Sequence, residues 1–290
     1  MHLLIYGCIL GILLGGVYGL MASGLALVWG IMRVLNIAQA VCVILGSYLA
    51  FTAFTVLHVD PMLAVLPISV VMFVFGVGIY YAFLRPIRRD RESLSILVTY
   101  AIAIGIEGAL GLIYTTSLQH TGTSYATQSF EVGGFQIPTV ELYAFLISVA
   151  ILGLLALMLQ RTRLGRALRA ATQNPTAARL LGVDIDRVSA VGFGIGISTA
   201  AAAGAVYGMI YSFNPNSHYD LIGILLAIVV LGGFGSMRGA IVAALILGVI
   251  ASVVFIYWPL WANLSFFGVV VVVLLFRPQG LWGVPNWATQ

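Results

Sequence analysis

The chain has 290 residues, of which 61% are hydrophobic and 8% are charged, and its mean hydropathy is +1.10. Apolar runs without any charged side chain, such as residues 3–29, exclude a water-soluble globular protein and indicate a chain that crosses a membrane several times. The formal net charge is +4, but the 13 basic residues are scattered between the apolar runs and form no basic face, which argues against a nucleic-acid partner.

Nine apolar runs follow one another along the chain. A hydrocarbon core about 30 Å thick needs roughly 20 helical residues at 1.5 Å each. Runs of about this length predict an all-α polytopic membrane protein with about nine transmembrane helices, organised as a single transmembrane domain over residues 1–290. In chain order the predicted spans are 3–29, 38–57, 62–84, 93–115, 140–159, 189–212, 221–236, 239–257 and 260–276.

The charged residues between the spans predict the orientation of the chain. Cytoplasmic loops attract basic residues, and all 13 here are arginine. An outside N-terminus and a cytoplasmic C-terminus place every one of them inside: Arg33, Arg85, Arg88, Arg89, Arg91, Arg161, Arg163, Arg166, Arg169, Arg179, Arg187, Arg238 and Arg277. The same orientation sends the following residues to the outer face: His2, His58, His120, His218, Asp60, Glu131, Glu141 and Asp220.

The run 221–236 is short and rich in glycine. A re-entrant hairpin is the alternative to a full crossing at this length, but it would put Arg238 and Arg277 outside, so a full crossing is favoured. A phosphate-binding P-loop is excluded because the chain has no lysine. We interpret the glycines here as sites of close helix packing: Gly232, Gly233, Gly235 and Gly239.

Two loops are long. The external loop 117–139 carries turn and strand formers, which predict a short hairpin lying over the outer surface. The cytoplasmic loop 160–188 holds six of the 13 arginines, at positions 161, 163, 166, 169, 179 and 187. Its first part, "RTRLGRALRAATQ", is predicted to continue the preceding helix into the cytosol.

A second, short helix is predicted from Pro175 to Leu181. Asn174 is a favourable N-cap, Pro175 suits the first helical position, and Gly182 allows a left-handed exit. A helix of two turns is not stable alone, and Ala177, Leu180 and Leu181 would form a small apolar surface able to enter a groove. The alternative is an interfacial helix that only connects two spans.

Three polar residues lie within or beside the predicted spans. Glu107 lies well inside a span, where a carboxylate is costly and marks a functional site by default. The alternative is a protonated Glu107 bonded to a neighbouring helix, whose approach would be allowed by the nearby glycines: Gly105, Gly108 and Gly111. Asn36 and Gln39 either line the inner mouth of a pathway or cap the start of the second span.

The sequence contains no arrangement typical of an enzyme or a metal site. The four histidines fall in separate segments, and no Ser/His/Asp, Cys/His or HExxH pattern occurs. The two cysteines, Cys8 and Cys42, lie within or beside apolar runs, which argues against a disulfide framework. We therefore expect no catalytic residues, no metal and no cofactor in this chain.

Four stretches resemble, in order and spacing, the LivH-type permease family of branched-chain amino acid ABC importers. They are "GLMASGLALVWGIMRVLNIAQA", "GRALRAATQNPTAARLLGVDIDRV", "LAIVVLGGFGSMRGAIVAALILG" and "LLFRPQGLWG". The resemblance covers most of the chain. One departure is the segment Asn36 to Val41, "NIAQAV", where relatives commonly show Asn-Phe-Ala-His-Gly-Glu. The missing histidine and acid leave the exact solute open.

The resemblance implies a permease subunit in the bacterial cytoplasmic (inner) membrane. It would pair with a paralogous or identical permease, two cytosolic ATPase subunits that bind ATP, and an external solute-binding protein, and would move a branched-chain amino acid or a related small amide or carboxylate by alternating access. The coupling helix implied by the resemblance comprises Asn174, Pro175, Thr176, Ala177, Ala178, Arg179, Leu180, Leu181 and Gly182.

The alternative is a self-sufficient secondary transporter or channel. Ion-coupled transport normally uses intramembrane ionisable residues or broken helices in paired repeats. The spans of this chain contain one well-placed acid and no clear repeat, so the ATP-driven importer is favoured.

Overall fold

The computed structural model describes the whole chain except residues 1, 88–90, 124–127, 133 and 283–290. Arg88 and Arg89, two of the arginines used to predict the orientation, lie outside the described residues. Nine described helices are long and apolar enough to cross a membrane, which confirms the predicted number and the all-α class.

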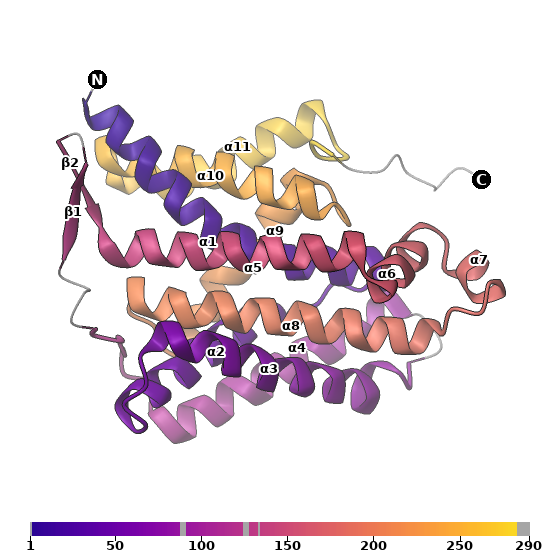
Figure 1. Ribbon diagram of the computed structural model, residues 1–290. Coiled ribbons are helices and arrows are strands. Elements are labelled where there is room, and N and C mark those ends of the chain that lie inside the picture. Colours follow the sequence, from indigo (N-terminus) through magenta and orange to yellow (C-terminus); the bar gives the residue numbers. More distant parts are fainter. Residues whose placement is uncertain (1, 88–90, 124–127, 133, 283–290) are drawn as a thin grey trace.

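The helices follow the predicted spans closely (Figure 1). The elements are α1 (His2–Met32), α2 (Ala38–Thr55), α3 (Pro61–Ile79) with a π-helical extension (Tyr80–Leu84), α4 (Arg91–Tyr114), β1 (Ser129–Val132), β2 (Phe135–Pro138), α5 (Thr139–Arg161), α6 (Arg163–Gln173), α7 (Pro175–Leu180), α8 (Ile185–Ile210), α9 (His218–Gly232), α10 (Met237–Tyr257) and α11 (Ala262–Phe276). Short 3-10 turns, Pro215–Ser217 and Pro259–Trp261, precede α9 and α11.

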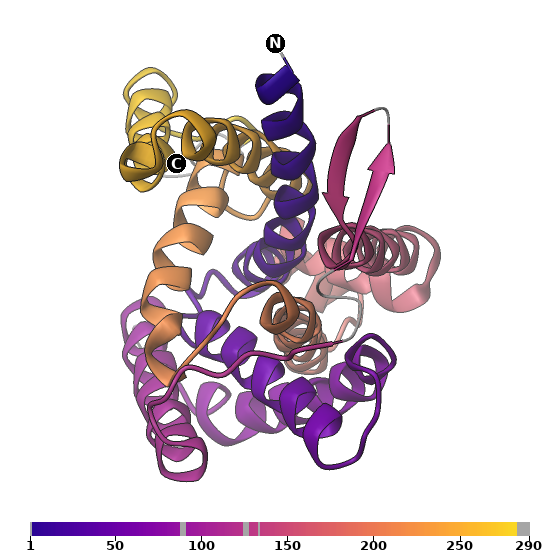
Figure 2. The ribbon, with the colours of Figure 1, turned by 90° about the vertical axis from the view of Figure 1, so that its left-hand side faces the viewer.

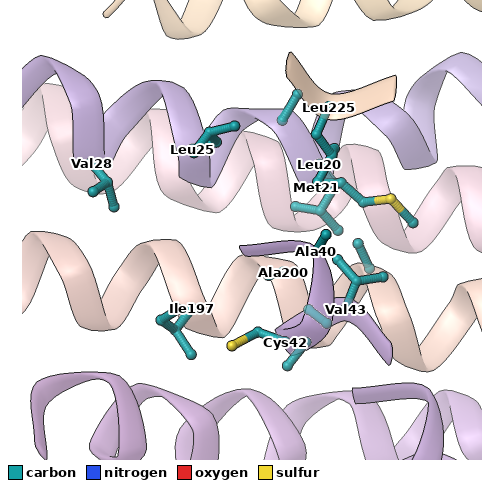
Figure 3. Packing of buried hydrophobic residues seen from close by; sticks show 14 of the residues in the cluster. Leu20, Met21, Leu25, Val28, Ala40, Cys42, Val43, Ile197, Ala200 and Leu225 are labelled. Carbon is teal, nitrogen blue, oxygen red and sulfur yellow. The ribbon is translucent and has the colours of Figure 1, made fainter. Parts of the chain in front are cut away.

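The α8 helix forms the centre of the bundle and packs against α1, α2 and α3. Its small residues let neighbouring backbones approach closely: a β-carbon at Gly204 would collide with the carbonyl oxygen of Val43 in α2. Figure 3 shows Leu20 of α1, Leu225 of α9 and Ala200 of α8 among the buried hydrophobic residues of the core. Close packing of small residues therefore holds this core together.

The two ends of the bundle differ. At one end lie the N-terminus and the β1–β2 hairpin, and at the other lie α6 and α7 (Figure 1). At the α6–α7 end, Gly30 at the end of α1 lies close to Thr172 of α6 and to Gly235 in the α9–α10 turn. The chain after α11 also returns to this end, because the N–H of Leu281 donates to the carbonyl oxygen of Leu231 (2.8 Å).

A hairpin forms within the loop 117–139. Strands β1 and β2 pair antiparallel, with Ser129 opposite Pro138. The ring of Phe135 stacks on His2, with 4.1 Å between ring centroids, and on Tyr6. The hairpin is thereby attached to the first turns of α1, and Figure 2 shows it beside the N-terminus.

The predicted continuation of α5 into the following segment is wrong, because the helix is interrupted at Thr162. This residue has extended backbone angles, and its side chain caps α6 by accepting a hydrogen bond from the N–H of Gly165 (2.9 Å). A β-carbon at Gly165 would collide with the carbonyl oxygens of Met158 and Leu159. A sharp turn thus starts α6 as a separate helix, which lies across the end of the bundle.

The predicted span 221–236 is displaced toward the N-terminus, since the apolar helix runs from Pro215 to Gly232. Gly233 and Gly235 have φ angles of 94° and 79° and form the turn into α10. The segment starts beside Phe213, which is paired with Gln119, and ends at the α6–α7 end of the bundle. Figure 2, in which α5 and α8 are seen end-on, shows α9 (orange) lengthwise and therefore strongly inclined to them.

Candidate functional site

The short helix α7 is built by three local signals. The Oδ1 atom of Asn174 accepts a hydrogen bond from the N–H of Ala177 (3.0 Å), Pro175 occupies the first helical position, and Gly182 has a φ angle of 83°. These features agree with the capping residues expected from the sequence. The helix ends at Leu180, one residue earlier than predicted, because Leu181 already has non-helical backbone angles.

The free surface of α7 is apolar at its C-terminal end. Leu180 and Leu181 are each 85% exposed, whereas Ala178 is 3% exposed and packs toward the bundle. Ala177 is also exposed. Burying these two adjacent leucines in a groove of another protein would be energetically favourable, because it removes their apolar surface from water.

The helix is firmly connected to the transmembrane bundle. The N–H of Val183 donates to the carbonyl oxygen of Ala178 (3.0 Å), and Asp184 caps α8 by accepting from the N–H of Arg187 (3.1 Å). Two residues further along the chain, Asp186 lies 3.7 Å from Arg85, which follows the π-helical end of α3. A displacement of α7 would therefore be transmitted to both α8 and α3.

Asn36 and Gln39 lie in the interior of the bundle. Both side chains are fully buried. The amide nitrogen of Gln39 donates to the carbonyl oxygens of Gly196 (3.0 Å) and Met21 (3.3 Å), and its oxygen accepts from the amide of Asn36 (3.3 Å). The predicted alternative, a side-chain cap at the start of α2, does not form, because the N-cap is Ile37 and makes no side-chain hydrogen bond. Gln39 instead joins α2 to α1 and α8.

Glu107 contacts the first turn of α9. Its Oε2 atom accepts a hydrogen bond from the hydroxyl of Tyr219 (2.9 Å) and lies 3.7 Å from Nε2 of His218. The Nδ1 atom of His218 lies 2.9 Å from the carbonyl oxygen of Pro215. Because a carbonyl oxygen only accepts, Nδ1 carries a hydrogen here.

The location of His218 corrects one prediction. The sequence places this histidine at the outer face, but it is only 3% exposed and lies behind Glu107. The turn at Pro215–Ser217 starts α9 within the protein and carries His218 and Tyr219 to the side of α4. The chain separation of 112 residues between Glu107 and Tyr219 leaves no local signal for this contact.

The glycines around Glu107 lie on an open side of α4. Nothing lies within 4 Å of a β-carbon built at Gly105, Gly108 or Gly111, so no described helix of this chain packs there. The carboxylate is tied to α9 and not to a helix admitted by the glycines. This part of α4 presents an open face, with Tyr100 44% and Ile104 47% exposed.

The glycines at the α9–α10 junction divide into two kinds. Gly232 and Gly239 face each other, since a β-carbon at Gly239 would collide with the carbonyl oxygen of Gly232. Gly233 and Gly235 supply the left-handed turn conformations, and Gly235 also lies against Gly30 of α1. The junction is a compact turn that brings α9 and α10 together.

Among the described residues, no group of three or more His, Cys, Asp or Glu side chains could hold a metal ion. The features described above are the exposed apolar end of α7, the buried amide of Gln39 and the carboxylate of Glu107 bonded to Tyr219.

Comparison with known families decides the class. Residues 8–275 match the family described as branched-chain amino acid transport system / permease component. The chain belongs to this permease family. It is therefore a multi-pass membrane subunit of an ABC importer and not an enzyme, as the sequence resemblance implies.

Individual relatives of this permease align over nearly its whole length. It is 30% identical to the high-affinity branched-chain amino acid transport system permease protein BraD of Pseudomonas aeruginosa, with 95% of this chain and 94% of the relative covered. Its identity to LivH of Escherichia coli is 29% with the same coverage. The E. coli permease protein LivM matches over 145 residues, 49% of this chain, at 33% identity. No solved structure matches the permease.

Proposed function

We propose that this permease imports a branched-chain amino acid, or a related small amide or carboxylate, across the bacterial cytoplasmic (inner) membrane. BraD and LivH are named as branched-chain amino acid permeases, and their similarity over the full chain supports this solute class. Transport would proceed by alternating access, in which the membrane-spanning helices of the permease move relative to one another.

The distribution of charge supports an outside N-terminus and a cytoplasmic α6–α7 end. Segments of this end carry Arg85, the arginines of α6 and α7, Arg238 and Arg277. The opposite end, with the hairpin, carries none of the described arginines. Basic residues accumulate on the cytoplasmic side of membrane proteins, so the hairpin would face outward.

We further propose that α7, with the residues Asn174 to Gly182, is the coupling helix. The observation that carries this proposal is the pair Leu180 and Leu181, both 85% exposed on a capped helix that packs against α8. The leucines would seat in a groove of a cytosolic ATPase subunit, and closure of the two ATPases on ATP would turn α8 and α3. No ATP would bind to this chain.

The remaining partners follow from the same arrangement. A second permease, identical or paralogous, would complete the passage, and the partial similarity to LivM is consistent with a paralogue. An external solute-binding protein would dock at the hairpin end and deliver the solute.

The test is uptake by the complete transporter reconstituted with its ATPases. Leu181→Asp should abolish solute uptake because a charge cannot enter an apolar groove, and Ala177→Trp should block seating sterically. Ala177→Ser, which preserves size, is the matched control and should transport normally. Uptake by Leu181→Asp at the wild-type rate would contradict the coupling helix, and uptake without any ATPase would favour a self-sufficient transporter.

A further inference from the structure

Only one of the two carboxylate oxygens of Glu107 contacts the described residues. Its described contacts, to Tyr219 and His218, both involve Oε2, and the side chain is 20% exposed. The other oxygen, Oε1, has no partner among the described residues and is not a buried atom. A carboxylate accepts about four hydrogen bonds, so Glu107 has room for a further donor.

The exposed side opens onto the uncovered face of α4. One turn and two turns before Glu107, Ile104 and Tyr100 are 47% and 44% exposed, and Tyr219 across from them is 49% exposed. Gly108 and Gly111 leave the space after Glu107 empty of described side chains. The face combines one carboxylate and two tyrosines with small and aliphatic residues.

Such a face is not suited to lipid. Ionisable side chains within membrane spans almost always face a bundle interior or a water-filled cavity, because a charge in hydrocarbon is costly. Glu107 lies two turns from the end of α4 at Tyr114, inside an apolar span. The exposed part of the carboxylate, 20% of the side chain, would therefore border a polar space, which in an importer of two permeases is the passage between them.

The chemistry of the face selects a cation. A carboxylate attracts an ammonium group and repels a carboxylate, and the rings of Tyr100 and Tyr219 are further sites of attraction for a cation. The nearest cationic candidate on this chain, His218, is 4% exposed in its side chain and lies behind Glu107, out of reach of the passage. Ile104 and the open glycines leave room for an aliphatic side chain.

We propose that Glu107, held by Tyr219, is a binding site for the ammonium group of an amino acid solute in the passage. This inference rests on the proposed function, because it assumes that the solute is an amino acid. It assigns the carboxylate to solute recognition and gives Tyr219 a positioning role. The neutral side chain of a branched-chain amino acid would then lie along Ile104 and the glycines of α4.

The first test uses the complete transporter with its partner permease, ATPases and binding protein in proteoliposomes. Glu107→Gln should assemble normally and lower the maximal rate of leucine uptake about tenfold or more, the order expected for loss of a charge-assisted hydrogen bond. Glu107→Asp, which keeps the charge, should retain more uptake than Glu107→Gln. Glu141→Gln, the same change in a half-buried carboxylate of α5, is the matched control and should transport normally.

A second measurement locates the residue directly. Glu107→Cys, in a background without Cys8 and Cys42, should react with a water-soluble cationic thiol reagent, and leucine under turnover should slow that reaction. Failure to react would overturn the proposal even if Glu107→Gln does not assemble. Wild-type leucine uptake by Glu107→Gln would also overturn it.

Failure of the proposed function and failure of the ammonium site give different results. If the wild-type complex takes up no leucine or needs no ATPase, the proposed function fails before Glu107 is tested. If the wild-type complex transports leucine and Leu181→Asp does not, but Glu107→Gln transports normally, only the ammonium site fails.

Discussion

Arg85 and Asp186 lie 3.7 Å apart and join the end of α3 to the first turn of α8, five residues beyond Leu181 at the tip of the short helix. The guanidinium of Arg85 also lies 5.6 Å from the ring of Tyr81 in the π-helical segment. The ion pair thus connects the proposed coupling helix to two of the helices that form the bundle core.

The Arg85–Asp186 pair should matter for coupling and little for stability. Both side chains are at least half exposed (58% and 50%), so removing the pair should change the free energy of unfolding by only ~0–1 kcal/mol. Arg85→Ala should nevertheless lower the number of solute molecules moved per ATP. The charge exchange Arg85→Asp with Asp186→Arg should restore part of the loss, and equal losses in the single and exchanged variants would contradict a coupling role.

Gly204 of α8 lies so close to the backbone of α2 that this position should accept no side chain. A β-carbon there would collide with the backbone of Val43, which cannot move without displacing α2. Gly204→Leu should therefore cost ~1–3 kcal/mol or more and lower the yield of folded protein in detergent. Gly153→Leu on α5, where nothing lies within 4 Å, is the control, and equal yields for the two variants would contradict the packing argument.

Gln39 should act as a structural tie. Gln39→Leu leaves the carbonyl oxygens of Gly196 and Met21 without the amide that bonds them, at a cost of ~1–3 kcal/mol. The loss should appear as a lower thermal-unfolding temperature of the purified protein. Thr55→Val, which removes an exposed hydroxyl bonded to Phe51, is the control and should leave that temperature unchanged. If Gln39→Leu unfolds at the wild-type temperature but takes up no solute, Gln39 acts in the solute pathway and not as a structural tie.

The orientation can be measured by thiol labelling of intact cells. Leu118 is 68% exposed at the hairpin end, and Thr176 is exposed on α7. In a cysteine-free background, Leu118→Cys should react with an impermeant reagent from outside and Thr176→Cys should react only after the membrane is opened. The reverse pattern would invert the orientation.

Local patterns in the sequence determined most of the architecture. Run length and hydropathy located nine spans, and strand and turn formers located the hairpin between α4 and α5. The α7 helix was predictable because Asn174, Pro175 and Gly182 act on their own backbone. Each of these signals involves residues within one or two turns of each other. A single sequence carries such signals in full.

The tertiary structure alone decided the roles of the polar residues. Gln39 bonds a carbonyl 157 positions away and Glu107 bonds a tyrosine 112 positions away, so neither partner is visible in a local pattern. The glycines near Glu107 permit a close helix contact, but no described helix of this chain packs there, and the sequence could not show this. The break at Thr162 also depended on context: the segment has helix-forming composition, and its direction was set by how α6 packs Leu168 against Gly192 of α8. Hydropathy specifies that a helix spans the membrane, but the face that it buries is determined by the helices that surround it.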